Sequence, residues 1–233
     1  MSEFVLPVPP VASVAVAECS ARFPVRRIFC VGRNYEAHAR EMSGDPDREP
    51  PFFFTKPADA VIDNDVIVPY PPETSNFQYE IELVVAIGKG GRNISVADAF
   101  NYVWGYATGI DLTRRDLQVA AREKGRPWDW GKAFDKSAPC APLHEAGKTG
   151  EILSGRIWLS VNDEVKQDAD IADLIWPVSD IISIISRSMT LAPGDLIYTG
   201  TPAGVGPVVA GDEVSGGIDG VGEITITVGL PEE

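Results

Sequence analysis

Proline and glycine divide this chain into short segments, and that limits its fold more than any other feature. The 233 residues include 22 glycines and 19 prolines. Between them lie short runs rich in valine, isoleucine and aromatic residues, which is typical of strands joined by tight turns. We therefore predict a mixed α/β fold that is mainly β, with few helices and without the regular strand–helix alternation of a doubly wound sheet.

The hydrophobic periodicity gives a coarse map of the elements. Two helices are predicted at Thr113–Lys124 and Ser179–Met189, with Thr113 capping the first and Gly125 ending it. A short third helix is expected at Asn34–Met42. The predicted strands are Arg27–Val31, Phe52–Lys56, Val66–Val68, Tyr79–Ile87, Val103–Ile110, Arg156–Val161, Asp195–Thr199 and Glu223–Val228.

Size and cysteine usage indicate one main domain in a reducing compartment. With 44% hydrophobic residues the chain can bury a sizeable core, and no composition break marks a linker. We expect residues 1–26 to form an N-terminal extension packed on the core, and residues 27–233 to form the main domain. The three cysteines lack CxxC spacing, and no apolar run is long enough to cross a membrane, so we expect a cytoplasmic protein.

Charge and glycine patterns argue against nucleic-acid and nucleotide ligands. The net charge of −14 is unfavourable for binding phosphate backbones, which requires clustered lysine and arginine. The stretch GKGGRN lacks the third glycine of GxGxxG, and GTPAGVG lacks the Lys-Ser/Thr that completes a P-loop. We therefore expect a small-molecule ligand, no nucleic acid and no membrane partner.

The segment QYEIELVV reads as a strand but carries two carboxylates two residues apart. Residues i and i+2 of a strand face the same side, so Glu80 and Glu82 project together, opposite an apolar face. Carboxylates held this close repel each other unless a cation lies between them. Oxygen ligands suit Mg²⁺, Mn²⁺ or Ca²⁺; the alternative is a solvated strand face.

A third carboxylate follows another predicted strand. The uncharged run GYATGI ends at Asp111, directly before the helix predicted at Thr113–Lys124. A carboxylate at a strand end can reach into a site, so Asp111 can complete a three-oxygen set with Glu80 and Glu82. Such a set leaves positions for water and substrate around one divalent cation.

Six segments occur in the order expected of the fumarylacetoacetate hydrolase family. They are CVGRNYEAHAREM, PPFFFTKPADAV, the strand with Glu80 and Glu82, GIDLTRRDLQ, GRPWDWGKAFD and PGDLIYTGTPAGVG. The chain resembles this family from roughly Arg27 to Val228, and most closely its short acylpyruvate hydrolases. Six motifs in order make the resemblance specific.

The resemblance implies a fold, an assembly and a metal centre. The fold would be the mixed β-roll of the family, the assembly a homodimer, and residues 27–233 the catalytic domain. The metal would be Mg²⁺ or Mn²⁺, with Ca²⁺ as an alternative occupant. On this resemblance Glu80, Glu82 and Asp111 are the expected metal ligands.

His38 and Glu41 lie three residues apart on the short predicted helix, so their side chains can meet. A glutamate that accepts one imidazole N–H fixes the tautomer and makes the other nitrogen a better base toward water. A surface pair on a polar helix is the alternative. Because NYEAHAREM resembles the catalytic lid of the family, the resemblance implies a catalytic role for both residues.

Further residues are expected around the substrate. Lys56 follows the run FFFT, and Lys132 lies among aromatic residues in WDWGKAFD; exposed lysine stems are the alternative for both. The resemblance implies that Lys132 stabilises developing negative charge. It also implies substrate contacts at Arg33, Tyr35, Lys56, Arg115, Gln118, Gly200 and Thr201.

The expected reaction is hydrolysis of the C3–C4 bond of a 2,4-dioxo acid such as fumarylpyruvate, giving pyruvate and a carboxylic acid. One alternative is oxaloacetate decarboxylation at the same metal site, for which His38 and Glu41 would be dispensable. Another is a non-catalytic β-rich protein whose carboxylates hold a structural Ca²⁺. The second alternative predicts a closed coordination shell and no turnover.

Overall fold

Two β-sheets form the body of the molecule, which a computed structural model describes for residues 4–37 and 50–232. The larger sheet has the order β12-β9-β8-β15-β3-β4 and the other the order β14-β13-β17-β18-β6, which confirms a mainly β fold. In the larger sheet the strands are β3 (Arg27–Gly32), β4 (Phe52–Lys56), β8 (Ile81–Ile87), β9 (Val103–Ile110), β12 (His144–Glu145) and β15 (Asp195–Tyr198). In the other they are β6 (Val66–Pro69), β13 (Arg156–Val161), β14 (Glu164–Asp170), β17 (Glu213–Ile218) and β18 (Gly222–Gly229).

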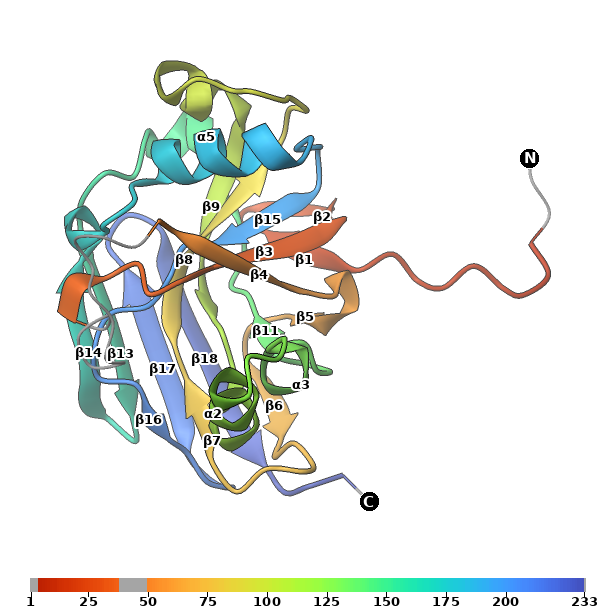
Figure 1. Cartoon of the computed structure of the whole chain (residues 1–233), viewed down its shortest axis with the longest axis vertical. Helices are drawn as coiled ribbons and strands as arrows, with labels where there is room; N and C mark the ends of the chain where they lie inside the picture. The colour runs from red at the N-terminus through yellow and green to blue at the C-terminus, as the bar shows by residue number, and fades with distance from the viewer. Residues whose placement is uncertain (1–3, 38–49, 233) are drawn as a thin grey trace.

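Smaller elements flank these sheets. Figure 1 shows α5 across one end of the sheets and α2 and α3 near the other. The helices are α2 (Arg115–Glu123), α3 (Asp129–Lys132), α4 (Ala146–Thr149) and α5 (Val178–Ser188), with 3-10 turns at Ala58–Ala60, Val96–Tyr102 and Ile171–Asp173. Short strands are β1 (Ser13–Val16), β2 (Cys19–Pro24), β5 (Val61–Ile62), β7 (Phe77–Tyr79), β10 (Thr113–Arg114), β11 (Ala138–Pro139) and β16 (Gly206–Pro207). Within the described residues, no helix is long and apolar enough to span a bilayer.

Strand β8 is buried on both faces because it lies inside the larger sheet. Its odd-numbered residues, Ile81 to Ile87, join the larger apolar core, which also includes residues of α5 and of the five-stranded sheet. On the other face Val84 and Ala86 join a second core beneath the β1–β2 hairpin. Because strand residues alternate, Glu80 and Glu82 continue the face of Val84 and Ala86 into the interior.

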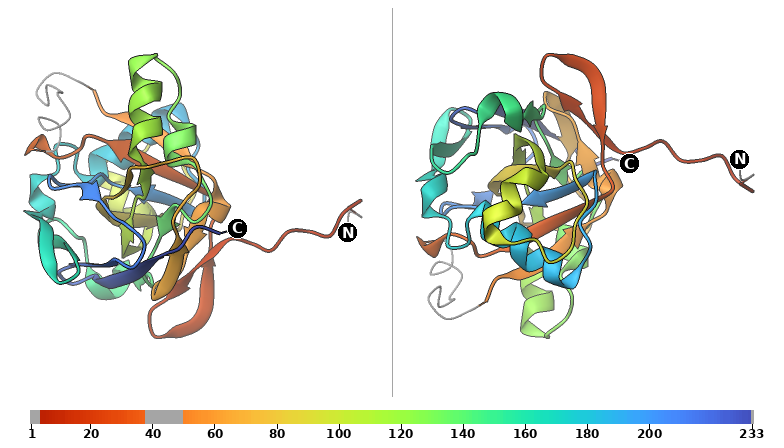
Figure 2. Two further views of the ribbon diagram at one scale, coloured as in Figure 1. Left: turned by 90° about the horizontal axis from the view of Figure 1, so that it is seen from below. Right: turned by 90° about the horizontal axis from the view of Figure 1, so that it is seen from above.

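The N-terminal residues divide into two parts. Strands β1 and β2 form a hairpin whose Val14 and Phe23 are buried in the second core. Residues 4–11 extend away from the body, as both views of Figure 2 show. Phe4 and Leu6 are exposed in this segment.

Two sequence predictions need correction where β7 meets β8. The strand predicted at Tyr79–Ile87 is interrupted at Glu80, and the helix predicted from Thr113 begins at Arg115. Thr113 does not cap that helix. It belongs to strand β10, where it pairs with Gln78 of β7, and its hydroxyl donates to the carbonyl of Asp111. Gly125 does follow the helix, with a φ of 61° that favours glycine.

Candidate active site

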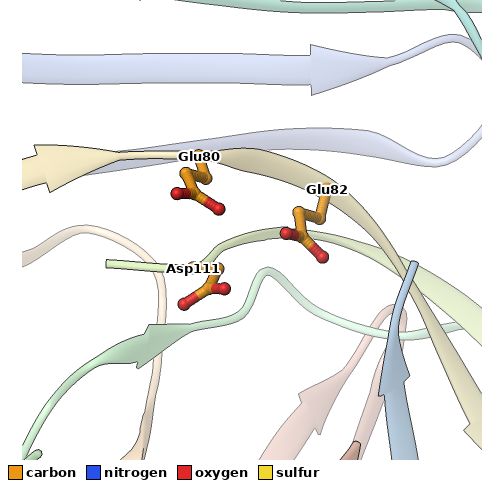
Figure 3. Close-up of side chains that lie close together, drawn as sticks. All are labelled: Glu80, Glu82 and Asp111. Atoms are coloured by element: carbon orange, nitrogen blue, oxygen red, sulfur yellow. The ribbon is translucent and has the colours of Figure 1, made fainter. Parts of the chain in front are cut away.

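Three buried carboxylates meet at the interruption between β7 and β8 (Figure 3). Glu80, Glu82 and Asp111 are 6%, 1% and 0% exposed, and each offers an oxygen within 4.8 Å of the others. Strand pairing brings them together, since Ile81 lies opposite Ile110 and the Asp111 amide donates to the Glu80 carbonyl at 2.8 Å. This is the three-oxygen set that the sequence predicted. The alternative of a solvated strand face is wrong, because all three side chains are buried.

Lys132 links two of these carboxylates. Its Nζ lies 3.0 Å from Glu80 Oε2 and 2.7 Å from Asp111 Oδ2, and it donates to the Thr113 hydroxyl at 2.6 Å. Burial by itself lowers the pKa of Lys132, but Asp111 and Glu80 offset it, and the pKa is raised above its usual value. Lys132 therefore stays charged inside the site. It is 1% exposed, so the alternative of an exposed stem does not hold.

Lys56 and Arg115 also form ion pairs with the carboxylates, Lys56 with Asp111 and Arg115 with Glu80. Lys56 Nζ lies 2.9 Å from Asp111 Oδ1 as an ion pair, and it donates to the carbonyls of Leu112 and Lys132. Arg115 donates to Glu80, to Gln118 and, at 2.7 Å, to Gln78 Oε1. These additional hydrogen bonds hold Lys56 and Arg115 in place, and the two cations in turn fix the positions of Asp111 and Glu80.

Glu82 is the carboxylate with the least compensation. It accepts a hydrogen bond from the Gly200 amide at 2.8 Å, but among the described residues it forms no ion pair. Burial, followed by the neighbouring Asp111 and Glu80, raises the pKa of Glu82 well above its usual value. A bound cation would relieve this penalty. Three clustered carboxylates with one under-compensated member fit a hard divalent metal ion.

The loop after β15 is held from one side by a residue that sequence reasoning did not single out. Asn34 is fully buried; its Nδ2 donates to the carbonyls of Thr199 and Trp176, and its Oδ1 accepts from the Trp176 amide. Gly200 has a φ of 102°, and a Cβ there would lie 2.6 Å from the Asn34 Cβ. The Asn34 contact therefore requires glycine at position 200 and aims its amide at Glu82.

Gln167 holds the same loop from the other side and was also missed. It is fully buried in β14, where its Oε1 accepts from the Ile81 amide at the β7–β8 interruption. Its Nε2 donates to the Thr201 hydroxyl at 2.9 Å and to the Pro202 carbonyl at 2.8 Å. A glutamine at an inward position of an otherwise polar strand is the signal that could have found it.

A cleft of ≈ 530 Å³ opens beside the carboxylates. Arg33, Phe52, Phe54, Trp128 and Lys132 line it, and the same residues line a smaller adjoining space that reaches Glu80, Arg115, Gln118 and Thr201. Most of the predicted substrate contacts therefore share one connected cavity.

Tyr35 is a predicted substrate contact but does not line this cavity. Tyr35 is 2% exposed and lines a separate cleft with Pro202 and Ala203, and burial followed by Glu82 raises its pKa. His38 and Glu41 lie outside the described residues, as does most of the short helix expected at Asn34–Met42.

Comparison with known proteins places the chain in a family. The family model for the fumarylacetoacetate (FAA) hydrolase C-terminal domain matches residues 27–229. The chain belongs to the fumarylacetoacetate hydrolase family. A family member from Ralstonia sp., named fumarylpyruvate hydrolase, is 47% identical over 189 residues, covering 81% of this chain and 97% of that protein.

Two other family members extend the comparison. The mitochondrial oxaloacetate tautomerase FAHD1 of Bos taurus is 41% identical over 207 residues, covering 89% of this chain and 93% of its own length. The crystal structure of fumarylpyruvate hydrolase from Pseudomonas aeruginosa, in complex with Mn²⁺ and pyruvate, matches with a TM-score of 0.97 and 51% identity. It covers 98% of this chain and 100% of that chain. This chain is thus an enzyme of the family, with an acidic site suited to a divalent metal.

Proposed function

We propose that the protein is a metal-dependent hydrolase that cleaves the C3–C4 bond of a 2,4-dioxo acid, with fumarylpyruvate as substrate. The observation that carries the proposal is the cluster of Glu80, Glu82 and Asp111 at the end of an open cleft. The similarity to two proteins named fumarylpyruvate hydrolase supports this substrate. An open cleft beside the carboxylates also favours turnover over a closed structural Ca²⁺ site.

The site residues take distinct roles in this proposal. Glu80, Glu82 and Asp111 would hold Mg²⁺ or Mn²⁺, which as a Lewis acid favours the enolate form of the departing pyruvate. Lys132 remains charged and offsets the negative charge that develops on the C4 oxygen. Thr201 and Arg115, which line the space beside Glu80, would bind the substrate. Lys56 and Gln118 hold Asp111 and Arg115 in place.

Water activation is assigned to the pair His38 and Glu41 on the family resemblance. His38 removes a proton from water, Glu41 orients the imidazole, and the resulting hydroxide adds to C4. When the C3–C4 bond breaks, its electron pair stays on C3, which takes up a proton. The products are pyruvate and, from fumarylpyruvate, fumarate.

Oxaloacetate decarboxylation is the second candidate. The similarity to an oxaloacetate tautomerase favours it, since that relative handles the same kind of oxo acid. Decarboxylation also yields a pyruvate enolate but requires no attacking water. The two reactions therefore differ in their need for His38.

A side-by-side assay of fumarylpyruvate, acetylpyruvate, fumarylacetoacetate and oxaloacetate with added Mn²⁺ or Mg²⁺ tests the proposal. We expect fumarylpyruvate to have the highest kcat/KM. His38→Ala should reduce acylpyruvate cleavage on the order of 10²- to 10⁴-fold and leave any oxaloacetate activity nearly unchanged. Equal losses on both substrates would remove the water-activating role from His38, and oxaloacetate as the best substrate would overturn the proposed function.

We also propose a homodimer, on the family resemblance, and a location in the cytoplasm, on the cysteine pattern of the sequence. Sedimentation of the purified protein measures the assembly. A single species of monomer mass at micromolar concentration would contradict it.

A further inference from the structure

One wall of the cleft is aromatic and leads to the carboxylates. Phe52 and Phe54 of β4 face the same side as Lys56, because strand residues alternate, and Lys56 contacts Asp111. The Trp128 ring packs edge-on against Phe52 with centroids 5.0 Å apart, and lies 5.9 Å from Phe54. The same face of one strand therefore forms the wall and the base of the site.

The position of Phe52 depends on a glycine. A Cβ at position 32 would lie 2.0 Å from the Cζ atom of Phe52, so only glycine leaves room for this ring. Arg33, the next residue, has a φ of 56°, a conformation that is uncommon for residues other than glycine. The backbone thus makes room for the ring and places Arg33 at the cleft.

The two ends of the aromatic wall carry positive charge. Lys132 Nζ lies 5.1 Å from the Phe54 ring at the carboxylate end, and the Arg33 guanidinium lies 5.7 Å from the Phe52 ring at the other. Lys132 is already engaged with Glu80 and Asp111. Among the described residues that line the larger cleft, Asp129 is the acidic one, and it is exposed.

We propose that the acyl end of the substrate lies along this wall, and that Arg33 binds a carboxylate at its far end. This rests on the proposed function and narrows its substrate class to flat, unsaturated acyl groups that end in a carboxylate. A conjugated acyl group presents a flat face to Phe52 and Trp128. The planar fork of arginine suits a terminal carboxylate, which it can bind through two hydrogen bonds.

Fumarylpyruvate and acetylpyruvate separate the role of Arg33 from general binding, because only the first has a distal carboxylate. Arg33→Met should lower kcat/KM for fumarylpyruvate on the order of 10- to 100-fold, the loss typical of a charge-assisted contact, and change that for acetylpyruvate by less than about 3-fold. Arg33→Lys should recover part of the loss. Arg187→Met, at an exposed position on the distant α5, is the matched control.

A saturated analogue, succinylpyruvate, tests the aromatic wall separately, because it keeps the distal carboxylate but is not flat. Phe52→Leu should lower kcat/KM for fumarylpyruvate by about 3- to 10-fold and leave succinylpyruvate nearly unchanged. Arg33→Met should affect both dicarboxylates alike. Asp129→Asn should improve both slightly, because it removes a negative charge from the cleft.

The outcomes distinguish this inference from the proposed function. Wild-type cleavage of acylpyruvates tests the function, and only the ratio between substrates tests Arg33 and Phe52. If Arg33→Met, with an unchanged melting temperature, loses activity equally on fumarylpyruvate and acetylpyruvate, Arg33 binds the part that both substrates share and the inference is wrong. Absence of wild-type activity on every acylpyruvate would instead overturn the function.

Discussion

Two fully buried aspartates lie at opposite ends of the strands of the six-stranded sheet, and only one belongs to the candidate site. Asp195 begins β15, whereas Asp111 follows the end of β9. Asp195 accepts from Arg26 Nη1 at 2.9 Å, from Arg27 Nε and Nη2 at 3.1 and 3.2 Å, and from the Ala192 amide. Both of its oxygens thus accept hydrogen bonds, and the two arginines compensate a single negative charge.

Asp111 is as buried as Asp195 but has different charged neighbours. It shares its surroundings with Glu80 and Glu82, and its cations are the lysines Lys56 and Lys132. Clustered like charges raise the free energy of the folded protein unless a ligand compensates, which is why such clusters mark functional sites more often than single buried ions do. The comparison teaches that a buried carboxylate becomes informative when others converge on the same point.

The largest effect should come from removing one charge of the cluster. Glu82→Gln keeps the shape of the side chain, and its oxygen can still accept from Gly200. We expect kcat to fall by more than about 100-fold, because even outer partners of metal ligands typically account for 10- to 100-fold. The melting temperature of the EDTA-treated variant should equal or exceed that of the wild type, since a carboxylate with a raised pKa is removed. Full activity in this variant would reject Glu82 as a metal ligand.

Asp195→Asn should give the reverse result. It breaks a buried ion pair whose arginines are partly exposed, so we expect a loss of roughly 2 to 3 kcal/mol of unfolding free energy. That corresponds to a melting temperature lower by about 5 to 10 °C. Activity per folded molecule should stay near the wild-type value. A loss of activity as deep as that of Glu82→Gln would mean that Asp195 is needed for the reaction and is not purely structural.

The positioning residue Gln167 should give a smaller, mixed effect. Gln167→Met leaves the Ile81 amide and the Thr201 hydroxyl without their buried partner, which costs roughly 1 to 2 kcal/mol. Because Thr201 would lose its hydrogen-bond partner, KM for the proposed acylpyruvate substrate should rise by about 10-fold with a smaller change in kcat. Val165→Met, at an exposed position of the same strand, is the control. An unchanged KM would make Gln167 purely structural.

The sequence predicts eight strands of the two main sheets but misses β12, β14 and β17, and it places some strand ends wrongly. Period-two runs such as that of β8 are local signals, and the chain order of motifs identifies the family. The interruption at Glu80 is not local, because it depends on Gln167, which accepts from the Ile81 amide and lies 86 residues beyond Ile81 in the chain. A prediction made from residues 79 to 87 alone contains no information about Gln167, so it cannot find the interruption.

The candidate site shows the same division between local and distant information. Glu80, Glu82 and Asp111 could be predicted because carboxylates are rare on apolar strands. Asn34 could not be predicted from the spacing of charged residues, because a buried amide shows its role only through partners such as Thr199, far along the chain. Thr113 was given a capping role by its position before a helix, whereas its hydroxyl accepts from Lys132.

The smallest effect should come from an ion pair with the same fork geometry at the surface. Arg156 donates to Asp168 through Nε at 2.8 Å and Nη2 at 3.0 Å, much as Arg27 does to Asp195, but the two side chains are 47% and 54% exposed. Solvent screens such a pair and its ordering costs side-chain entropy, so Asp168→Asn should lower the melting temperature by less than about 2 °C.

The pH dependence of that small effect has a defined sign. The hydrogen bond from Arg156 lowers the pKa of Asp168, so the contribution is present above its ordinary pKa of 3.8 and is lost as the pH falls through the lowered value. The gap in melting temperature between wild type and Asp168→Asn should therefore narrow as the pH is lowered from about 6 toward about 3. A gap as large as that of Asp195→Asn would mean that fork geometry alone, and not burial, sets the strength of these pairs. The expected difference in stability between the buried pair of Asp195 and the exposed pair of Asp168 would then disappear. Burial could no longer explain the contribution of Asp195 to stability.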